Sequence, residues 1–506
     1  MKPLAGMCAA AKRRGGGKVA AETLCSELMD SFRNGTICFR IYFFLYLCCK
    51  LFHRMKNNQT TADALAAATD TAAMEIGIGI LDRLPQMFTD VFPQKRALVV
   101  ADDNTWRAAG SAVYGHLAAA GIRCDEPFIF TDAALHADWR YVEMLDARLA
   151  ATDAIPIAVG AGTINDLCKL CSYHNGRQYM CVATAASVDG YSSFGASITY
   201  KGMKQTFTCP APRAIVADVG VMAAAPAPMT AAGYADLAAK IPAGAEWLIA
   251  DFVGVEPVHD VAWHIVQDGL KDALADPEGV AALRPEAIVP LVEGLMLSGF
   301  AMQAARSSRP ASCTDHLFSH LWNMRNHTYN GVTPSHGFQV SVGTLFMCAM
   351  FDRMYLTDFT KLDVDRCAAE WKSADEVRRE AEELFRGEPF AEAAVTEIMA
   401  KYDDRSEVRR QLQRLKENWP DLKTRLQSQC YTFDRMYRML RTVGAPVRPE
   451  DIGIPRLQMK ADIHRVRQIR RRYGLPDLGL RAGMLDTWID GIFGRGGVWE
   501  IGRQTA

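Results

Sequence analysis

Histidines gather in one short segment in the second half of the chain. Of its eleven histidines, four fall within twenty-one positions: His316, His320, His327 and His336. His316 and His320 are four residues apart, which places them on one face of a helix. Asp236 lies in an apolar context, where an unpaired carboxylate is costly. Two imidazoles and a carboxylate suit a divalent metal with open positions for substrate, whereas a structural role is the alternative for any single histidine.

A glycine-rich turn precedes a predicted helix in the first half of the chain. The segment Gly160-Ala161-Gly162-Thr163 follows an apolar run. Glycines let the backbone approach a phosphate, and a helix N-terminus offers free N–H groups and the positive end of a dipole. Asn165 stands where the third glycine of a GxGxxG pattern would be. The turn therefore indicates a dinucleotide phosphate site, with a tight turn that binds no ligand as the alternative.

Small and hydroxyl-bearing residues follow the next apolar run, from Thr184 to Ser193, with Asp189 as their one carboxylate. Ligands bind at the carboxyl ends of strands in parallel sheets. The segment suits a sugar-like or nicotinamide partner, although a capped turn is equally compatible with it. Lys204, in a predicted hairpin, is a candidate contact for a substrate phosphate or else an exposed lysine.

Alternating apolar and amphipathic stretches predict the elements that must position these residues. Strands are expected at 96–101, 127–130, 155–159, 179–184 and 214–218, helices at 105–120, 139–150 and 163–173, and a hairpin at 197–208 turning at Lys201-Gly202. This order indicates a parallel sheet covered by helices on both faces. After Pro226 we expect only helices, at 229–240, 245–252, 258–273, 286–305, 373–386, 391–402 and 407–418. The predicted domains are an α/β dinucleotide-binding domain at 55–225 and a helical metal- and substrate-binding domain at 226–506.

Charge and cysteine content exclude other classes of protein. The chain has 57 basic and 58 acidic residues, so it lacks the basic field of a nucleic-acid-binding protein. Its 14 cysteines include one CxxC, Cys168 to Cys171, without the second pair of a structural zinc site. We expect reduced thiols in a cytoplasmic protein.

The N-terminal segment contains an apolar stretch, Ile37 to Phe52, interrupted by Arg40 and Lys50. Its uninterrupted run, 41–49, is far shorter than the ~20 residues that span a bilayer, so we expect no stable membrane span. We expect residues 1–54 to be an extension upstream of the real start of the protein, near Met55, with a weak membrane anchor or a docking element as alternatives.

Five segments occur in an order typical of one enzyme family: GAGTINDLCK at 160–169, TAASVDGYSS at 184–193, GYADLAAK at 233–240, SSRPASCTDHLFSHLW at 307–322 and SHGFQVSVGT at 335–344. Together they resemble the sn-glycerol-1-phosphate dehydrogenases, specifically the bacterial AraM-like branch. The wider superfamily contains glycerol dehydrogenase, iron-containing alcohol dehydrogenases and dehydroquinate synthase. The resemblance implies a dehydroquinate synthase-like fold, with a Rossmann-like domain followed by an all-helical metal-binding domain.

The resemblance also implies roles for individual residues. It assigns the metal to Asp236, His316 and His336, and substrate contacts to Asp189, Asp236 and His320, so that Asp236 and the three histidines form the catalytic set. The dinucleotide, NAD(H) or NADP(H), is assigned to Asp102, Gly160, Gly162, Thr163, Ile164, Asn165, Asp166, Thr184, Ala185, Ala186, Ser187 and Ser193. Asp102 would face the adenosine ribose and repel the 2′-phosphate of NADP. The metal could be zinc, nickel or iron.

Four positions depart from the family pattern. Asp315 replaces a glutamate before the first histidine ligand, and Phe338 replaces one after the second; Cys313 and Ala235 stand where glycines are common. The change at Phe338 removes an expected carboxylate beside the metal, and such partners tune metal affinity.

The implied activity is metal-dependent, NAD(P)H-linked interconversion of dihydroxyacetone phosphate and sn-glycerol-1-phosphate, a reaction of phospholipid biosynthesis. The metal would act as a Lewis acid on the ketone oxygen. A glycerol dehydrogenase acting on free polyols is the nearest alternative, and a non-catalytic regulatory homologue is a further one. A homodimer is the family expectation.

Overall fold

The computed structural model describes residues 60–502, apart from the side chain of Met203. The chain divides into two compact units, 1–63 and 64–506, and the description below concerns the second. The expectations for residues 1–54 lie outside the described residues.

A six-stranded, all-parallel sheet forms the first half of this unit, in the order β1-β8-β5-β4-β2-β3. Its strands are β1 (Ala73–Gly77), β2 (Ala97–Asp102), β3 (Phe128–Phe130), β4 (Ile155–Gly160), β5 (Met180–Ala183) and β8 (Ala214–Asp218). The central strands are continuous apolar runs buried on both faces, as parallel strands under two helical layers must be. The five predicted strands are confirmed.

The strand β1 was not predicted from the sequence. It lies at an edge of the sheet, pairs only with β8, and is half-buried throughout. Because it carries Glu75 and lacks a long apolar run, its periodicity does not distinguish it from a loop.

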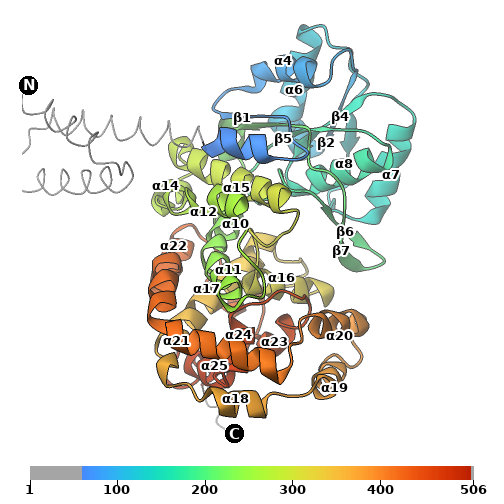
Figure 1. Ribbon diagram of the computed structural model, residues 1–506. Helices are drawn as coiled ribbons and strands as arrows, with labels where there is room; N and C mark the ends of the chain where they lie inside the picture. The colour runs from blue at the N-terminus through green and yellow to red at the C-terminus, as the bar shows by residue number, and fades with distance from the viewer. Residues whose placement is uncertain (1–59, 503–506) are drawn as a thin grey trace, which may run out of the picture. The chain divides into compact units, whose positions relative to one another are not determined.

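Helices cover both faces of the sheet (Figure 1). Alternate residues of β2 join different cores: Leu98 and Val100 pack with α7 (Trp139–Ala150) and α8 (Gly162–His174). Val99 packs instead with α4 (Leu84–Val91) and α6 (Ser111–Ala119). The two-layer cover predicted from the sequence is therefore confirmed. Cys168 and Cys171 lie buried in α8 with free thiols.

The predicted helix over 105–120 is interrupted. It consists of α5 (Asp103–Thr105), a π-helical turn η2 (Trp106–Gly110) and then α6. The predicted hairpin is confirmed as β6 (Ala196–Tyr200) and β7 (Met203–Phe207), paired antiparallel. Its turn residues Lys201 and Gly202 both have positive φ, 51° and 76°, as a two-residue type I′ turn requires.

The second half of the unit is helical, and no strand follows β8 within the described residues. Beyond α9 (Val219–Ala223) it comprises α10 (Ala227–Ala238), α11 (Lys240–Val253), α12 (Asp260–Gln267), α13 (Leu270–Ala273), α14 (Pro277–Ala281), α15 (Pro285–Ala305), α16 (Thr314–Met324), α17 (His336–Tyr355), α18 (Val364–Glu370), α19 (Ala374–Leu384), α20 (Ala391–Ala400), α21 (Arg405–Gln429), α22 (Phe433–Thr442), α23 (Arg456–Val466), α24 (Leu475–Arg481) and α25 (Leu485–Phe493). Helix α21 extends beyond the predicted 407–418 because a second helix continues across a kink at Asn418.

Among the described helices, α15 is the one that is long and apolar enough to cross a membrane. Its most apolar window is 72% buried inside the protein, which is typical of the core helix of a globular domain. This helix packs against α10 and α12, and its burial accounts for its composition.

Helix α10 lies in direct backbone contact with the elements on either side of it. A Cβ at Gly233 would stand 2.0 Å from the carbonyl oxygen of Ala186, in the loop after β5. A Cβ at Gly337, in α17, would stand 2.0 Å from the carbonyl oxygen of Ala232. Because neither backbone can give way as a flexible side chain would, glycine at these two positions permits the close packing of α10.

We expect Gly233→Ala to destabilise the protein by about 1–3 kcal/mol, the usual cost of overpacking. The matched control is Gly115→Ala in α6, where nothing lies within 4 Å of the added methyl group. Because alanine is the better helix former, the control should be neutral or slightly stabilising. Urea unfolding of both variants measures the difference, and equal stabilities would contradict the packing argument.

Candidate active site

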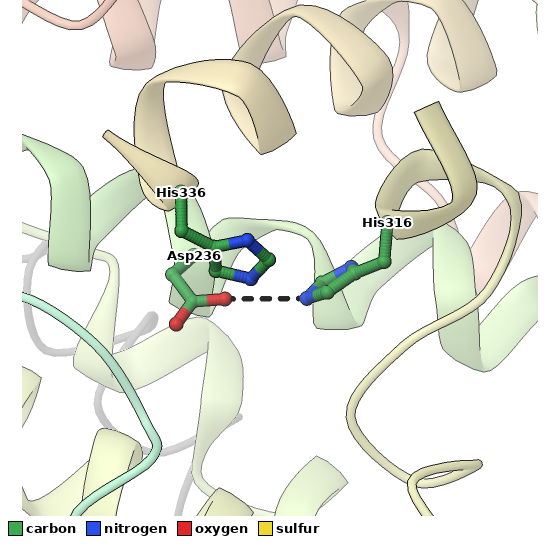
Figure 2. Close-up of side chains that lie close together, drawn as sticks. All are labelled: Asp236, His316 and His336. Atoms are coloured by element: carbon green, nitrogen blue, oxygen red, sulfur yellow. Dashed lines mark ion pairs between the residues drawn. The ribbon is translucent and has the colours of Figure 1, made fainter. Parts of the chain in front are cut away.

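Three helices bring Asp236, His316 and His336 together (Figure 2). Asp236 lies in α10, His316 in the first turn of α16, and His336 at the start of α17. One side-chain ligand atom from each lies within 4.8 Å of the others, and His316 Nε2 lies 3.3 Å from Asp236 Oδ1. The two imidazole rings stand 5.3 Å apart, centre to centre.

This arrangement fits a divalent metal. Nitrogen and oxygen ligands lie ~2 Å from zinc, so two of them are at most ~4 Å apart around one ion. Small side-chain rotations would therefore close the three groups onto a metal. Two imidazoles and one carboxylate are also the donors of several catalytic metal sites that keep a position for substrate.

The outward nitrogen of each histidine has its own partner. Asp315 Oδ1 lies 2.9 Å from His316 Nδ1, which orients the ring with its Nε2 toward Asp236. Ser319 Oγ lies 3.0 Å from His336 Nδ1. The carboxylate expected after the second histidine is Phe338 in this chain, and the hydroxyl of Ser319 contacts His336 instead. Such partners fix the ring orientation and tune the basicity of a ligand.

Lys240 is the residue at this site whose role the sequence did not indicate. Its ammonium group is fully buried, 2.8 Å from Asp236 Oδ1 and 2.9 Å from Asp189 Oδ2. The two residues are also joined directly, because the Asp189 backbone N–H donates to Asp236 Oδ2 at 3.0 Å. Ser298 Oγ donates to Asp189 Oδ2 at 2.8 Å. The only sequence signal for Lys240 is its i+4 spacing from Asp236.

The charges of the triad follow from these contacts. Burial raises the pKa of Asp236, but the Lys240 ammonium and the hydrogen bond to His316 hold that pKa well below its usual value. Burial lowers the pKa of His316, yet Asp315 and Asp236 outweigh it and raise that pKa to about 9. For His336 burial prevails and lowers the pKa to about 3, despite Asp236. The carboxylate and His336 are thus ready to bind a metal, whereas His316 must release a proton to do so.

His320 lies one helical turn after His316, and its side chain makes no hydrogen bond within the described residues. Burial, followed by the positive charge of Arg470 and the two other imidazoles, holds the pKa of His320 well below its usual value. It is therefore a neutral imidazole on the face of α16 that carries His316. The remaining histidine of the cluster, His327, lies apart and contacts the Ile452 carbonyl at 2.7 Å.

The predicted phosphate turn lies where β4 ends and α8 begins. Helix α8 starts at Gly162, and its N-cap residue Ala161 supplies no side-chain hydrogen bond, so the first N–H groups of the helix have no side-chain cap. A Cβ at Gly160 would stand 2.5 Å from the Ile164 Cβ. The turn thus needs glycine for its own packing and leaves backbone donors available for an anion.

The next two residues of this segment hold the neighbouring loops in place. Asn165 is buried and its side chain donates to the Gly190 carbonyl at 3.3 Å. Asp166 Oδ2 accepts from the Ser197 N–H at 3.1 Å, which fastens the hairpin to α8. Lys169 Nζ donates to the carbonyls of Gly190, Ser193 and Gly195 at 2.9–3.0 Å. One helix therefore shapes the loop that carries Asp189.

The other predicted cofactor residues lie along the same edge of the sheet. Thr184 to Ser187 follow β5, and the Thr184 N–H donates to the Gly160 carbonyl at 3.2 Å, which joins the two predicted segments. Ser193 is buried, with its hydroxyl on the Gly190 carbonyl. Asp102 stands at the end of β2, where Oδ1 caps α5 through the N–H groups of Asn104 and Thr105. Its Oδ2 makes no hydrogen bond within the described residues.

Comparisons with known proteins identify the family of this chain. The model of the iron-containing alcohol dehydrogenase family matches residues 75–226. A glycerol-1-phosphate dehydrogenase (NAD(P)+) of Bacillus licheniformis is 30% identical over 325 residues, which are 63% of this chain and 77% of that protein. The chain belongs to the glycerol-1-phosphate dehydrogenase family.

Other matches define the extent of this similarity. The glycerol-1-phosphate dehydrogenase (NAD(P)+) of Halalkalibacterium halodurans is 34% identical over 255 residues, and the match spans 64% of that protein and 50% of this chain. The crystal structure of glycerol dehydrogenase from Schizosaccharomyces pombe aligns with a TM-score of 0.53 and 15% identity, covering 84% of this chain and 91% of that one. The latter match shows the common fold, an α/β domain followed by helices.

We expect Lys240→Met to destabilise this glycerol-1-phosphate dehydrogenase family member by about 3–5 kcal/mol in the absence of metal, because two buried carboxylates lose their cation. A bound divalent ion would restore positive charge beside Asp236, so zinc or nickel should recover part of the loss. Thermal unfolding with chelator and with metal measures both effects.

The matched control for this variant is Lys361→Met, since the Lys361 side chain is 83% exposed. It should be close to neutral, as surface ion pairs contribute little. If metal does not recover any of the stability lost in Lys240→Met, the proposed charge balance is contradicted.

Proposed function

We propose that this protein catalyses the metal-dependent, NAD(P)H-linked interconversion of dihydroxyacetone phosphate and sn-glycerol-1-phosphate. The observation that carries the proposal is the buried group of Asp236, His316 and His336, joined through Lys240 to Asp189 in the loop after β5. The relatives named glycerol-1-phosphate dehydrogenase support the choice of substrate. The product would enter phospholipid synthesis.

Asp236, His316 and His336 would hold the metal, which would supply Lewis acidity at the ketone oxygen, and a bound dinucleotide would supply or accept the hydride. The chain's own residues bind and orient the substrate. We assign its hydroxyl groups to Asp189 and Asp236, which Lys240 contacts and holds in place. Reduction of the ketone adds one proton to its oxygen, and the neutral imidazole of His320, one turn from His316, is our candidate for its relay.

We assign the dinucleotide to the edge of the sheet formed by the ends of β2, β4 and β5. Its pyrophosphate would lie against Gly160 and Gly162 at the uncapped start of α8, with Thr163 to Asp166 in the first turns. Thr184 to Ser187 and Ser193 would line the nicotinamide side. The free Oδ2 of Asp102 suits a ribose hydroxyl, which favours NAD(H) over NADP(H).

The divalent metal is zinc, nickel or iron in this proposal, because all three accept two histidines and a carboxylate. We also propose that the protein is a homodimer and that it is located in the cytoplasm. Glycerol dehydrogenase, the alternative activity, is the function named for the Schizosaccharomyces pombe structure, whose likeness to this chain concerns the fold alone.

Steady-state assays of the metal-loaded protein test this proposal. We expect NADH or NADPH oxidation with dihydroxyacetone phosphate and much slower turnover with dihydroxyacetone. Asp236→Asn should abolish both metal retention and turnover, because the only carboxylate ligand is lost while its size is kept. Metal content by mass spectrometry and activity are measured together on the same samples.

The outcomes separate the alternatives. Preference for dihydroxyacetone over dihydroxyacetone phosphate would reassign the protein as a glycerol dehydrogenase. If dihydroxyacetone phosphate is preferred, the chirality of the product would confirm that it is sn-glycerol-1-phosphate. Cofactor binding without turnover with zinc, nickel or iron would indicate the non-catalytic homologue.

Lys204 is our candidate for the substrate phosphate. It lies exposed on β7, which packs against α16, and forms no hydrogen bond or ion pair within the described residues. Its charge acts on His320 and His336, since it lowers the pKa of both imidazoles. An ammonium group in this position suits a phosphate that extends from the metal site toward the hairpin.

We expect Lys204→Met to raise the KM for dihydroxyacetone phosphate by about 10–100-fold, the loss of one charge-assisted hydrogen bond of about 1.5–3 kcal/mol. Turnover of dihydroxyacetone should change little. The matched control is Lys201→Met in the turn of the same hairpin, which lies over the ring of Tyr200. Equal effects on both substrates would show that Lys204 does not contact the phosphate.

A further inference from the structure

A cavity of about 230 Å³ lies in the helical half of the protein. It is enclosed by α18, α19 and α20 on one side and by residues 467–483 on the other, at the end of the molecule where Figure 1 shows α19 and α20. Trp371, Lys401, Tyr402, Arg467, Asp477 and Arg481 are among its lining residues. None of the residues assigned to the metal, the substrate or the dinucleotide lines it.

Three cations lie buried at this cavity. The side chains of Lys401, Arg467 and Arg481 are only 5%, 13% and 4% exposed. Asp403 pairs with Arg481 at 2.7 Å, and Asp477 pairs with Lys401 at 2.9 Å. Three buried cations thus share two carboxylates.

Arg467 is the cation left without a close partner. Its nearest carboxylate oxygen, on Asp477, is 3.7 Å away and already serves Lys401. Its Nε is buried and has no hydrogen-bond partner. A buried guanidinium N–H without an acceptor costs free energy that an anionic ligand would recover.

The electrostatics of the cluster agree with a shortage of negative charge. Burial lowers the pKa of Lys401, and the charge of Arg467 lowers it further, although Asp477 opposes both. Burial likewise lowers the pKa of Arg467 against the influence of Asp477 and Glu380. The other acids on the lining, Glu370 and Glu380, are exposed to solvent, and Glu380 pairs with Lys372.

The wall beside these cations is aromatic. The rings of Trp371 and Tyr402 are nearly parallel, 20° apart with centres separated by 6.4 Å. The Trp371 indole is fixed by its N–H, which donates to the Asp403 carbonyl at 2.8 Å. A fixed, flat apolar surface favours a planar ligand. The cavity volume is below the about 300–1,000 Å³ of sites for drug-sized ligands, so the ligand must be small.

We propose that this cavity is a binding site for a small planar aromatic carboxylate, with the carboxylate on Arg467 and the ring against Trp371. The Arg467 guanidinium, whose ion pair with Asp477 is long at 3.7 Å, supplies parallel N–H donors, which carboxylates accept in a bidentate manner. The neighbouring cations add attraction without having to leave their own partners. The site is independent of the proposed dehydrogenase reaction.

Calorimetric titration of the full-length, metal-loaded protein tests this site with benzoate and with benzamide, a neutral molecule of nearly the same shape. We expect saturable binding of benzoate and at least about tenfold weaker binding of benzamide, a difference of about 1.4 kcal/mol. Arg467→Gln should weaken the binding of benzoate by a similar factor. The control Arg471→Gln, a neighbouring arginine with a 71% exposed side chain, should leave binding unchanged.

Two further variants keep the test decisive. Trp371→Leu should weaken the binding of benzoate and of benzamide to the same extent. This variant serves as the test if Arg467→Gln does not fold. Asp236→Asn should leave benzoate binding intact, because the proposed cavity does not include the metal site. If benzoate bound at the metal instead, its binding would disappear in this variant together with the metal. Any of four results would overturn the proposal. Two concern the wild-type protein, namely no saturable benzoate binding, or equal affinities for benzoate and benzamide. The other two are benzoate binding that survives Arg467→Gln and benzoate binding that disappears in Asp236→Asn.

Discussion

The candidate active site depends on one buried ammonium group between two carboxylates. Lys240 contacts Asp236, in α10, and Asp189, in the loop after β5, and thereby joins the helical half of the protein to the sheet. Without a cation, two carboxylates in this fully buried region would repel each other and lose hydration. The pair of contacts therefore sets both the charge and the position of the residues assigned to metal and substrate.

Helix α8 provides the second constraint. It begins at Gly162, one of the two glycines assigned to the dinucleotide, and Lys169, two turns later, holds three carbonyls of the loop that contains Asp189. Cofactor and substrate residues are thus positioned by the same rigid element. A change in the packing of α8 would displace both groups together, whereas the histidines on α16 and α17 would be affected through Asp189 and through the hairpin that packs against α16.

The sequence predicted the features that depend on local pattern. Continuous apolar runs predicted the central strands, and the Lys201-Gly202 turn predicted the hairpin. The ordered segments of the family pattern predicted Asp236 and the two histidines that the structure brings together. Edge strand β1 was missed because half-exposed strands lack a clear periodicity. Lys240 was missed because a lysine four residues after an aspartate is usually a solvent-exposed helix pair. The contacts of Asp315 and Ser319 with the histidines depend on tertiary packing.

The order of these residues along the chain has a consequence for biosynthesis. Asp189, Asp236 and Lys240 are complete before either metal-binding histidine has been made, and His336 follows Asp236 by a hundred residues. At about 5–20 residues per second, the ribosome needs roughly 5–20 s to cover that interval. During this time Lys240, which begins α11 four residues after Asp236, is the counter-charge nearest in sequence. A metal that needs both histidines could therefore bind only after the start of α17 has left the ribosome.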